Sequence, residues 1–341
     1  MMMNMNLRYS ISLLALMSFV FYGCEREINL EHLRPDPKLV LNCLALQGDT
    51  LAVELSRTWF YTEDIPDVYV SGADVELYVN DVFRERLTET KNEGGYPVDE
   101  TIRYKSLFYL PATGDRIRIV ASKEGFKTAE AVTEIPRPCA VSDCRLIQET
   151  VRDTSSWGDD YTYIYVSQTN KIQFTLRDEP GEENYYLLYL RQGNVYGGDE
   201  DTTYRWSSFF PDYGSEPLFA VQSSAFDQIL GYDGVGGYNG LAFSDELFAG
   251  KSYQFNIPWN MSYSYTENVV NHPYRYRCYV YSISRSYYNY MKSLNDLYES
   301  GFTGDLAEIG FAEPIRIYSN VEGGTGILGG GYLYSQEFEG E

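Results

Sequence analysis

Histidine is nearly absent from the 341-residue sequence, which has only two, His32 and His272. Neither lies near a second histidine or a cysteine at the spacing of familiar zinc sites, and the G-x-S-x-G turn of serine hydrolases does not occur. We therefore expect no metal site, no cofactor and no enzymatic activity. Because 49 residues are acidic, some carboxylate pair could still face a cleft, and an unrecognised hydrolase is kept as a third alternative.

Basic residues and long apolar runs are also scarce. The 27 lysines and arginines stand against 49 aspartates and glutamates, which gives a net charge of −22. An acidic surface repels phosphate backbones, so we expect no nucleic-acid partner. The apolar run near the N-terminus, Ile11–Tyr22, has about 12 residues, whereas a membrane-spanning helix needs roughly 20. The run therefore has the dimensions of a signal peptide.

The first residues follow the pattern of a bacterial lipoprotein leader. The small residue Gly23 lies directly between the apolar run and Cys24, as in a lipobox. We expect a signal peptide over residues 1–23, acylation of Cys24, and a lipidated tether over residues 24–38 that anchors the protein to a membrane. The alternative is a secreted protein that is cleaved elsewhere.

Four further cysteines follow Cys24. Cys139 and Cys144 lie close together in RPCAVSDCRL, and we predict a disulfide between them because export permits such bonds. Cys43 and Cys278 occur in strand-like segments. They are interpreted as buried free thiols.

From residue 39 onward the sequence is typical of a mainly β protein. Apolar and polar residues alternate in TLAVELSR (50–57), ADVELYVN (73–80) and RIRIVAS (116–122), as in half-buried strands. Short strands without helical patterns between them predict an Ig-like antiparallel β-sandwich over residues 39–136. The two prolines of EIPRPCAVSDC mark its end.

Residues 137–341 are predicted to form a larger, tyrosine-rich β domain with segments such as YTYIYVSQ (161–168). One amphipathic helix is expected at about 284–300, because apolar residues recur there at helical spacing. A single helix among strands has to bury its apolar stripe on a sheet. We therefore interpret this helix as structural.

The segment GTGILG (324–329) matches the G-x-G-x-x-G pattern of dinucleotide sites. Such a site also needs a helix at that loop and an acidic residue about 20 positions later, and too few residues follow. We interpret these glycines as positions where the chain turns or passes close to neighbouring backbone.

Aromatic residues are abundant, and 33 residues are tyrosines. Tyr161, Tyr163 and Tyr165 share one face of a predicted strand, which suits either a half-wet sheet surface or a contact surface. Other aromatics lie in loop-like contexts, where they could stack on a glycan or peptide ligand or could cap the ends of the sandwich. The candidate ligand-binding residues are Tyr204, Trp206, Trp259, Tyr263 and Tyr265.

Several segments together resemble a Bacteroidota lipoprotein family known as domain of unknown function 4249. They are CEREINL, PKLVLNCLAL and SGADVELYVN in the first half, followed by LAFSDELFAGKSYQFNI, VYSISRSYYNYMKSLNDL and EPIRIYSNVEGGTGILGG. The resemblance covers nearly all of the chain after Cys24. It implies a lipoprotein of the outer membrane or cell envelope, often encoded beside a TonB-dependent transporter, with no established enzymatic residues.

The resemblance also bears on location, since acidic residues after the lipidated cysteine favour cell-surface display in such bacteria. Glu25 and Glu27 fit this signal, although Arg26 interrupts it. The leading expectation is a surface lipoprotein that is a non-catalytic accessory or binding component of a TonB-dependent nutrient uptake system. The alternative is a structural or adhesive envelope protein that makes protein–protein contacts.

Overall fold

The computed structural model describes most of the chain after the predicted leader. The described residues are 34–60, 68–91, 102–157, 161–196, 203–209, 241–266, 274–298 and 315–340, together with 32, 63, 211, 213, 216–220 and 313. Cys24, the predicted signal peptide and most of the predicted tether lie outside the described residues.

The chain forms two compact units. The first comprises Met1–Asp36 and Phe60–Asp64, and the second comprises Pro37–Trp59 and Ile65–Glu341. In the first unit the Arg34 guanidinium pairs with Glu63 at 3.0 Å and lies 5.3 Å from the centre of the Phe60 ring. All of the sheets described below belong to the second unit.

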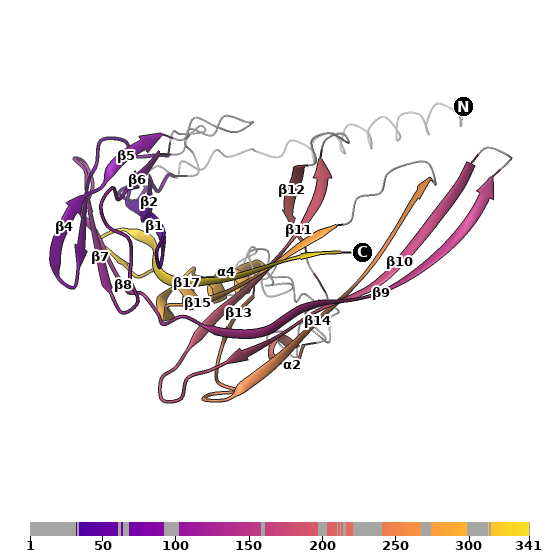
Figure 1. Cartoon of the computed structure of the whole chain (residues 1–341). Coiled ribbons are helices and arrows are strands. Elements are labelled where there is room, and N and C mark those ends of the chain that lie inside the picture. The colour runs from indigo at the N-terminus through magenta and orange to yellow at the C-terminus, as the bar shows by residue number, and fades with distance from the viewer. Residues whose placement is uncertain are drawn as a thin grey trace, which may run out of the picture. The chain divides into compact units, whose positions relative to one another are not determined.

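The described strands of the second unit form three sheets (Figure 1). The long sheet has the order β12 (Thr203–Ser208), β11 (Tyr185–Tyr196), β15 (Arg275–Ile283), β17 (Thr325–Glu339), β1 (Leu39–Leu46), β2 (Ala52–Arg57), β6 (Ile102–Lys105) and β5 (Thr88–Lys91), and β13 (Leu241–Ser244) also pairs with β11. The five-stranded sheet has the order β16 (Val321–Glu322), β8 (Ala129–Glu134), β7 (Arg116–Ser122), β3 (Asp74–Val79) and β4 (Val82–Arg86). The three-stranded sheet has the order β14 (Ser252–Thr266), β10 (Tyr161–Arg177) and β9 (Ala140–Trp157).

Two apolar cores hold these sheets together. The first core lies between the five-stranded sheet and the β1–β2 end of the long sheet, and Leu41 and Ile119 are among its fully buried side chains. The second core lies between the three-stranded sheet and the β11–β15 end, where the rings of Phe174 and Phe255 stack at 4.6 Å. Burial alternates along β1 and β15, as period-2 patterning requires. The mainly β, sandwich-like prediction is confirmed.

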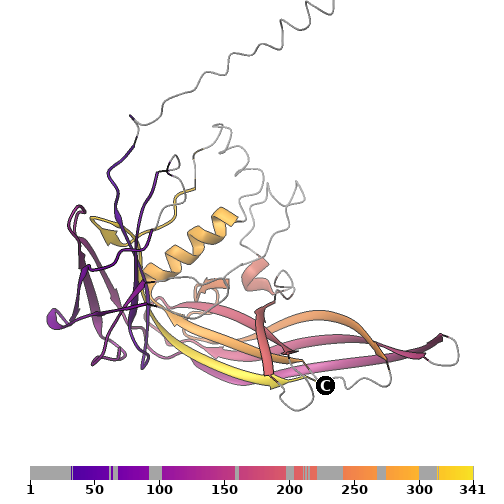
Figure 2. The same cartoon turned by 90° about the horizontal axis from the view of Figure 1, so that it is seen from above.

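The strand β17 joins the two halves of the long sheet. Its first residues run parallel to β1, and its last residues pair antiparallel with β15. Figure 2 shows this strand in yellow, running from the indigo N-terminal strands to the orange strand β15. Leu328 of β17, together with Val321 of the neighbouring strand β16, lies in the first core among residues of the predicted 39–136 sandwich. The first core therefore contains residues from both sides of the predicted boundary at residue 136.

Two glycines allow β17 to lie between close neighbours. A Cβ atom on Gly330 would be 2.1 Å from the carbonyl oxygen of Glu134 in β8, and one on Gly329 would be 2.5 Å from the Tyr287 ring. Both separations are far below van der Waals contact, so only glycine fits. Within GTGILG, a Cβ atom on Gly324 or Gly326 would be 2.6 or 2.2 Å from the carbonyl oxygen of Leu39 or Leu41 in β1, which confirms the interpretation of these glycines as sites of close backbone approach.

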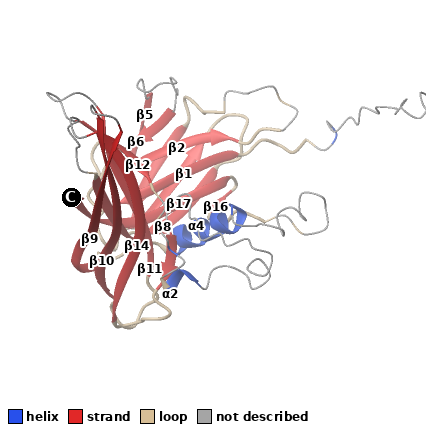
Figure 3. Ribbon diagram, turned by 90° about the vertical axis from the view of Figure 1, so that its right-hand side faces the viewer, coloured by secondary structure: helices blue, strands red, loops and turns tan. Residues whose placement is uncertain are grey.

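The predicted amphipathic helix is α4 (Arg285–Tyr298), and the short helix α2 (Pro217–Ala220) is the other described helix. The Ser284 hydroxyl accepts hydrogen bonds from the backbone N–H groups of Tyr287 and Gly330, which caps the helix and fixes it to β17. Met291 packs with Leu187 and other residues on the long sheet. Figure 3 shows α4, in blue, beside the strands. No described helix has the length and apolar character needed to cross a membrane.

The structure contradicts the predicted disulfide between Cys139 and Cys144. All four described cysteines carry free thiols. Residues 140–144 belong to the extended strand β9, which separates the two Cα atoms by more than about 10 Å, whereas a disulfide needs about 4.4–6.8 Å. The prediction failed because it treated proximity in the sequence as proximity in space.

The close packing around Gly330 generates a stability prediction. Gly330→Ala should lower the free energy of unfolding by about 1–3 kcal/mol, because the new methyl group meets a backbone oxygen that cannot move aside. Gly331→Ala is the matched control, since its methyl group would meet the flexible end of Leu46 at 2.9 Å. Urea unfolding monitored by fluorescence measures both. Equal losses for the two variants would contradict the close approach of β17 and β8.

Candidate functional site

Trp259, one of the predicted ligand-binding residues, lies in the second core. Its side chain is only 8 % exposed, and its ring contacts Phe209 at 5.2 Å and Tyr276 at 5.0 Å. The sequence analysis placed Trp259 in a loop, but it is the eighth residue of strand β14 and points inward. A binding role for Trp259 is therefore replaced by a packing role.

Tyr263 and Tyr265 follow Trp259 on the same face of β14. Their rings stack at 6.2 Å, and Tyr263 also contacts Tyr274 at 5.7 Å. Both side chains are half-buried and extend the aromatic packing of the second core. They do not lie with Tyr204 and Trp206, which belong to a different sheet.

The tyrosine row of β10 has its described members on the opposite, outer face of the three-stranded sheet. Tyr163 and Tyr165 are 38 % and 49 % exposed. Their cross-strand neighbours are Ser155 and Asp153 on β9, and Thr266 and Ser264 on β14. This half of the sequence prediction, a row of tyrosines at a wet sheet surface, agrees with the structure for these two residues.

Tyr204 and Trp206 lie on the face of the long sheet that is turned away from the second core. We call this the open face. Along β15, Arg275, Arg277, Tyr279 and Tyr281 point to the open face, because they alternate with the core residues Tyr276, Cys278 and Val280. The open face was not recognised in the sequence, although this alternation in YRYRCYVYS was its signal.

Stacked arginines order the aromatic rings of β12 on the open face. Arg275 lies 4.4 Å from the centre of the Tyr204 ring, and Arg277 lies 3.8 Å from that of Trp206. The Trp206 ring also lies over Gly193, where a Cβ atom would be 3.2 Å from it. Cation–π contacts of this kind hold a ring in one orientation. We call these four side chains the arginine ladder.

Glu337 on β17 anchors the arginine ladder. Its carboxylate accepts hydrogen bonds from Arg277 at 2.8 Å and from Arg275 at 3.1 Å. Burial acts to raise the pKa of Glu337, but the hydrogen bonds and charges of Arg277 and then Arg275 outweigh it, so the pKa lies below its ordinary value. The carboxylate is thus kept ionised, and the two arginines are kept in register with the rings.

A cavity of about 360 Å³ adjoins the arginine ladder, between the open face and α4. We call it the helix cavity. It is lined by Leu44, Leu187, Tyr189, Tyr281, Tyr287, Tyr290, Met291 and Leu294. Tyr189 connects it to the ladder, because its hydroxyl bonds with Ser208 of β12 and its ring lies 6.1 Å from Tyr279.

The lining of the helix cavity combines apolar surface with neutral hydroxyl groups. Burial raises the pKa of Tyr281 and of Tyr287 to about 12 in each case. Both hydroxyls therefore keep their protons at neutral pH and can donate as well as accept hydrogen bonds. A cavity of this kind suits a ligand with an apolar ring face and hydroxyl or amide edges. Tyr287 and Met291 belong to the apolar stripe of the predicted helix, for which the sequence pattern indicates packing alone.

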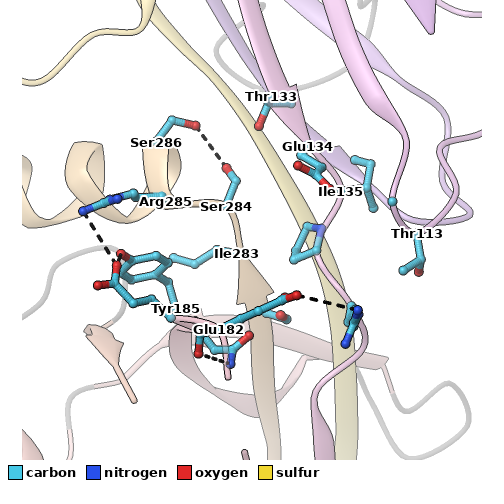
Figure 4. A pocket seen from close by; sticks show the side chains of 16 residues that line it. Thr113, Thr133, Glu134, Ile135, Glu182, Tyr185, Ile283, Ser284, Arg285 and Ser286 are labelled. Carbon is cyan, nitrogen blue, oxygen red and sulfur yellow. Dashed lines mark hydrogen bonds and ion pairs between the residues drawn. The ribbon is translucent and has the colours of Figure 1, made fainter. Parts of the chain in front are cut away.

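A larger cavity, of about 720 Å³, lies where the chain passes from β8 to β9 (Figure 4). Five charged side chains line it, and four of them form ion pairs: Arg137 with Glu182 at 3.7 Å, and Arg285 with Glu183 at 3.7 Å. Glu183 also accepts a hydrogen bond from the Tyr185 hydroxyl. Because these charges have partners, the lining directs little unmatched polarity at a ligand. The helix cavity is therefore the better candidate site.

The described residues include no group of three histidine, cysteine, aspartate or glutamate side chains that could hold a metal ion. The groups brought together at the helix cavity are aromatic rings, hydroxyls and aliphatic side chains. Such groups can bind and orient a molecule by stacking and hydrogen bonding.

The depressed pKa of Glu337 predicts a pH-dependent contribution to stability. Because the folded-state pKa is below the ordinary value of about 4.5, the contribution is present above that pH and is lost as the pH falls through the folded-state pKa. The side chain is 36 % exposed, so solvent screening limits the effect to about 1 kcal/mol or less. Urea unfolding of wild type and Glu337→Gln at pH 3–7 measures it. The difference should be largest near neutrality and vanish at the acidic end, whereas Glu339→Gln, at the more exposed neighbouring site, should show little difference at any pH.

A search of curated proteins finds no match. A family model described as "Domain of unknown function (DUF4249)" matches residues 25–337, which is most of the chain and includes every strand that forms the helix cavity and the arginine ladder. The chain therefore belongs to the DUF4249 family.

Proposed function

We propose that the protein is an outer-membrane lipoprotein displayed on the cell surface, where it binds a nutrient and assists a TonB-dependent transporter without catalysing a reaction. The leader pattern that ends in Cys24 supports the lipid anchor, and the resemblance to Bacteroidota lipoproteins supports the outer membrane and the transporter. The net charge of −22 supports a protein whose folded mass stays in water and away from anionic lipid.

The observation that carries the binding role is the helix cavity together with the arginine ladder. The cavity is of ligand size, since small-molecule sites measure about 300–1,000 Å³. Its rings are held in place before a ligand arrives: Tyr189 bonds with Ser208 and contacts the Tyr279 ring, Tyr279 stacks on Tyr281, and Tyr287 contacts Tyr290. Preorganised rings lose little conformational entropy on binding. A glycan or peptide unit with one apolar face fits this chemistry.

A second candidate function is a structural or adhesive role in the cell envelope. It is favoured by Tyr163 and Tyr165, which stand exposed among serine and threonine neighbours on the outer face of the three-stranded sheet. Surfaces of tyrosine mixed with small polar residues are typical of protein-recognition sites. On this alternative, Tyr163→Ser with Tyr165→Ser would reduce cell attachment and leave nutrient uptake unchanged.

A cavity-filling substitution tests the ligand site. Leu294→Trp places an indole in the helix cavity, so it should weaken binding at least tenfold, whereas Lys292→Trp on the exposed side of α4 should leave binding unchanged. Isothermal titration with maltohexaose, cellohexaose and a tryptic casein digest measures affinity. Thermal unfolding of each variant verifies that the fold is intact. Binding that is equal in both variants, or absent for every probe, would rule out the helix cavity as the site.

Affinity purification tests the proposed partner. The tagged protein is expressed in its native cell, captured from detergent-solubilised outer membrane and analysed by mass spectrometry. We expect a TonB-dependent transporter to be enriched over a control purification of an unrelated tagged lipoprotein. Recovery of the protein in the outer membrane without any transporter would count against the uptake role and favour the structural alternative.

A further inference from the structure

Three thiols of the second core lie close to one another. Cys278 on β15 is fully buried, and Cys139 and Cys144 pack against the same core from the start of β9. The Cys144 and Cys278 thiols hydrogen-bond to each other. This contact crosses the core between the three-stranded sheet and the long sheet, and the described strands of these two sheets form no backbone hydrogen-bond ladder with each other.

Cys144 lies beside a β-bulge and faces the second core from β9. The register between β9 and β10 shifts between Gln173 and Thr175, so that two residues of β9, Asp143 and Cys144, stand opposite Phe174. Asp143 has a φ of 53°, a left-handed conformation that is uncommon for a residue with a side chain. Cys144 lies two residues before Leu146, which also packs against the second core, so ordinary alternation turns its thiol inward. The bulge reverses the facing of the residues that precede it, and Ser142 is consequently exposed. Cys144 and Cys278 thus face the same core from two different sheets.

We propose that Cys144 and Cys278 form a disulfide that joins the three-stranded sheet to the long sheet. This inference goes beyond the proposed function and does not depend on it, although an exported protein would meet the oxidising conditions under which such bonds persist. The oxidant is a disulfide-bearing molecule, such as oxidised glutathione.

The bond forms by two exchange steps. The Cys144 thiolate attacks one sulfur of the oxidant, which gives a mixed disulfide and releases one glutathione thiolate. The Cys278 sulfur, as a thiolate, then attacks Cys144 and releases the second glutathione thiolate. Two electrons pass to the oxidant, and the two protons lost by the cysteines end on the released thiols.

The environments of the three thiols fit these roles. The hydrogen bond from Cys278 lowers the pKa of Cys144, which is also the more accessible of the two, so Cys144 is the attacking sulfur. The Cys139 thiol has a different partner, because it donates a hydrogen bond to the carbonyl oxygen of Val280 at 3.6 Å. Burial raises the pKa of this thiol to about 12. The described thiols and carboxylates here do not form a metal-binding group. Cys139 is therefore the control position.

Peptide mapping tests the bond. The full chain is purified in detergent and equilibrated with oxidised and reduced glutathione. After alkylation of free thiols, trypsin together with cleavage before Asp143 separates Cys139 from Cys144. We expect the peptide DCR (143–145) linked to CYVYSISR (278–285). Alkylated Cys144 and Cys278, or a link from either to Cys139, would overturn the proposal.

Thermal unfolding provides a second readout that needs no variant. Reduction of the wild-type chain should lower the melting temperature by about 5–15 °C, as expected for loss of a native disulfide in a chain of this size. Cys139→Ala should keep that shift, and the double variant Cys144→Ala, Cys278→Ala should lose it. If the double variant does not fold, the wild type and Cys139→Ala still test the proposal. A melting temperature that reduction leaves unchanged in both proteins would overturn it.

Discussion

The parallel pairing of β17 with β1 is the contact on which the rest of the structure depends. It places one glycine-rich strand against three partners at once, with β1 beside it in the sheet, β8 on one face and α4 on the other. Because Gly329 and Gly330 have no side chains, the Tyr287 ring of α4 and the backbone of β8 at Glu134 can approach β17 from opposite sides. The same strand continues to β15, so both apolar cores and the helix share a single long sheet.

The two faces of that sheet have different roles. One face is buried against the five-stranded and three-stranded sheets and supplies most of the apolar burial that stabilises the fold. The other face holds α4 and the arginine ladder, with the helix cavity between them. The candidate site is thus positioned by strands whose opposite sides are fixed in a core. Its tyrosines stand on rigid elements, which is the arrangement that gives a binding site precise geometry.

Local patterns predicted the local structure. Period-2 alternation identified the strands of the first core, and helical spacing identified α4. Residues 325–329 of GTGILG lie in strand β17 and not in a loop before a helix. Predictions that needed contacts between distant segments were less successful. Neither the β1 segment nor the β17 segment has a sequence pattern that predicts their pairing. The burial of Trp259 depends on which face of a long strand meets the opposite sheet. The bulge at Asp143 likewise changes the inward-facing residues by one position, which no simple alternation reveals.

The order of the strands also constrains when the protein can fold. The first core is lined almost entirely by residues made early in synthesis, yet it is completed by Val321 and Leu328, which are made late. Until β17 has emerged, β1 has an open edge and the early strands lack a neighbour on that side. Contacts between segments so distant in the sequence form slowly. The nascent chain would then stay loosely structured until nearly all of it is available, a state in which a polypeptide can still be threaded through a narrow channel.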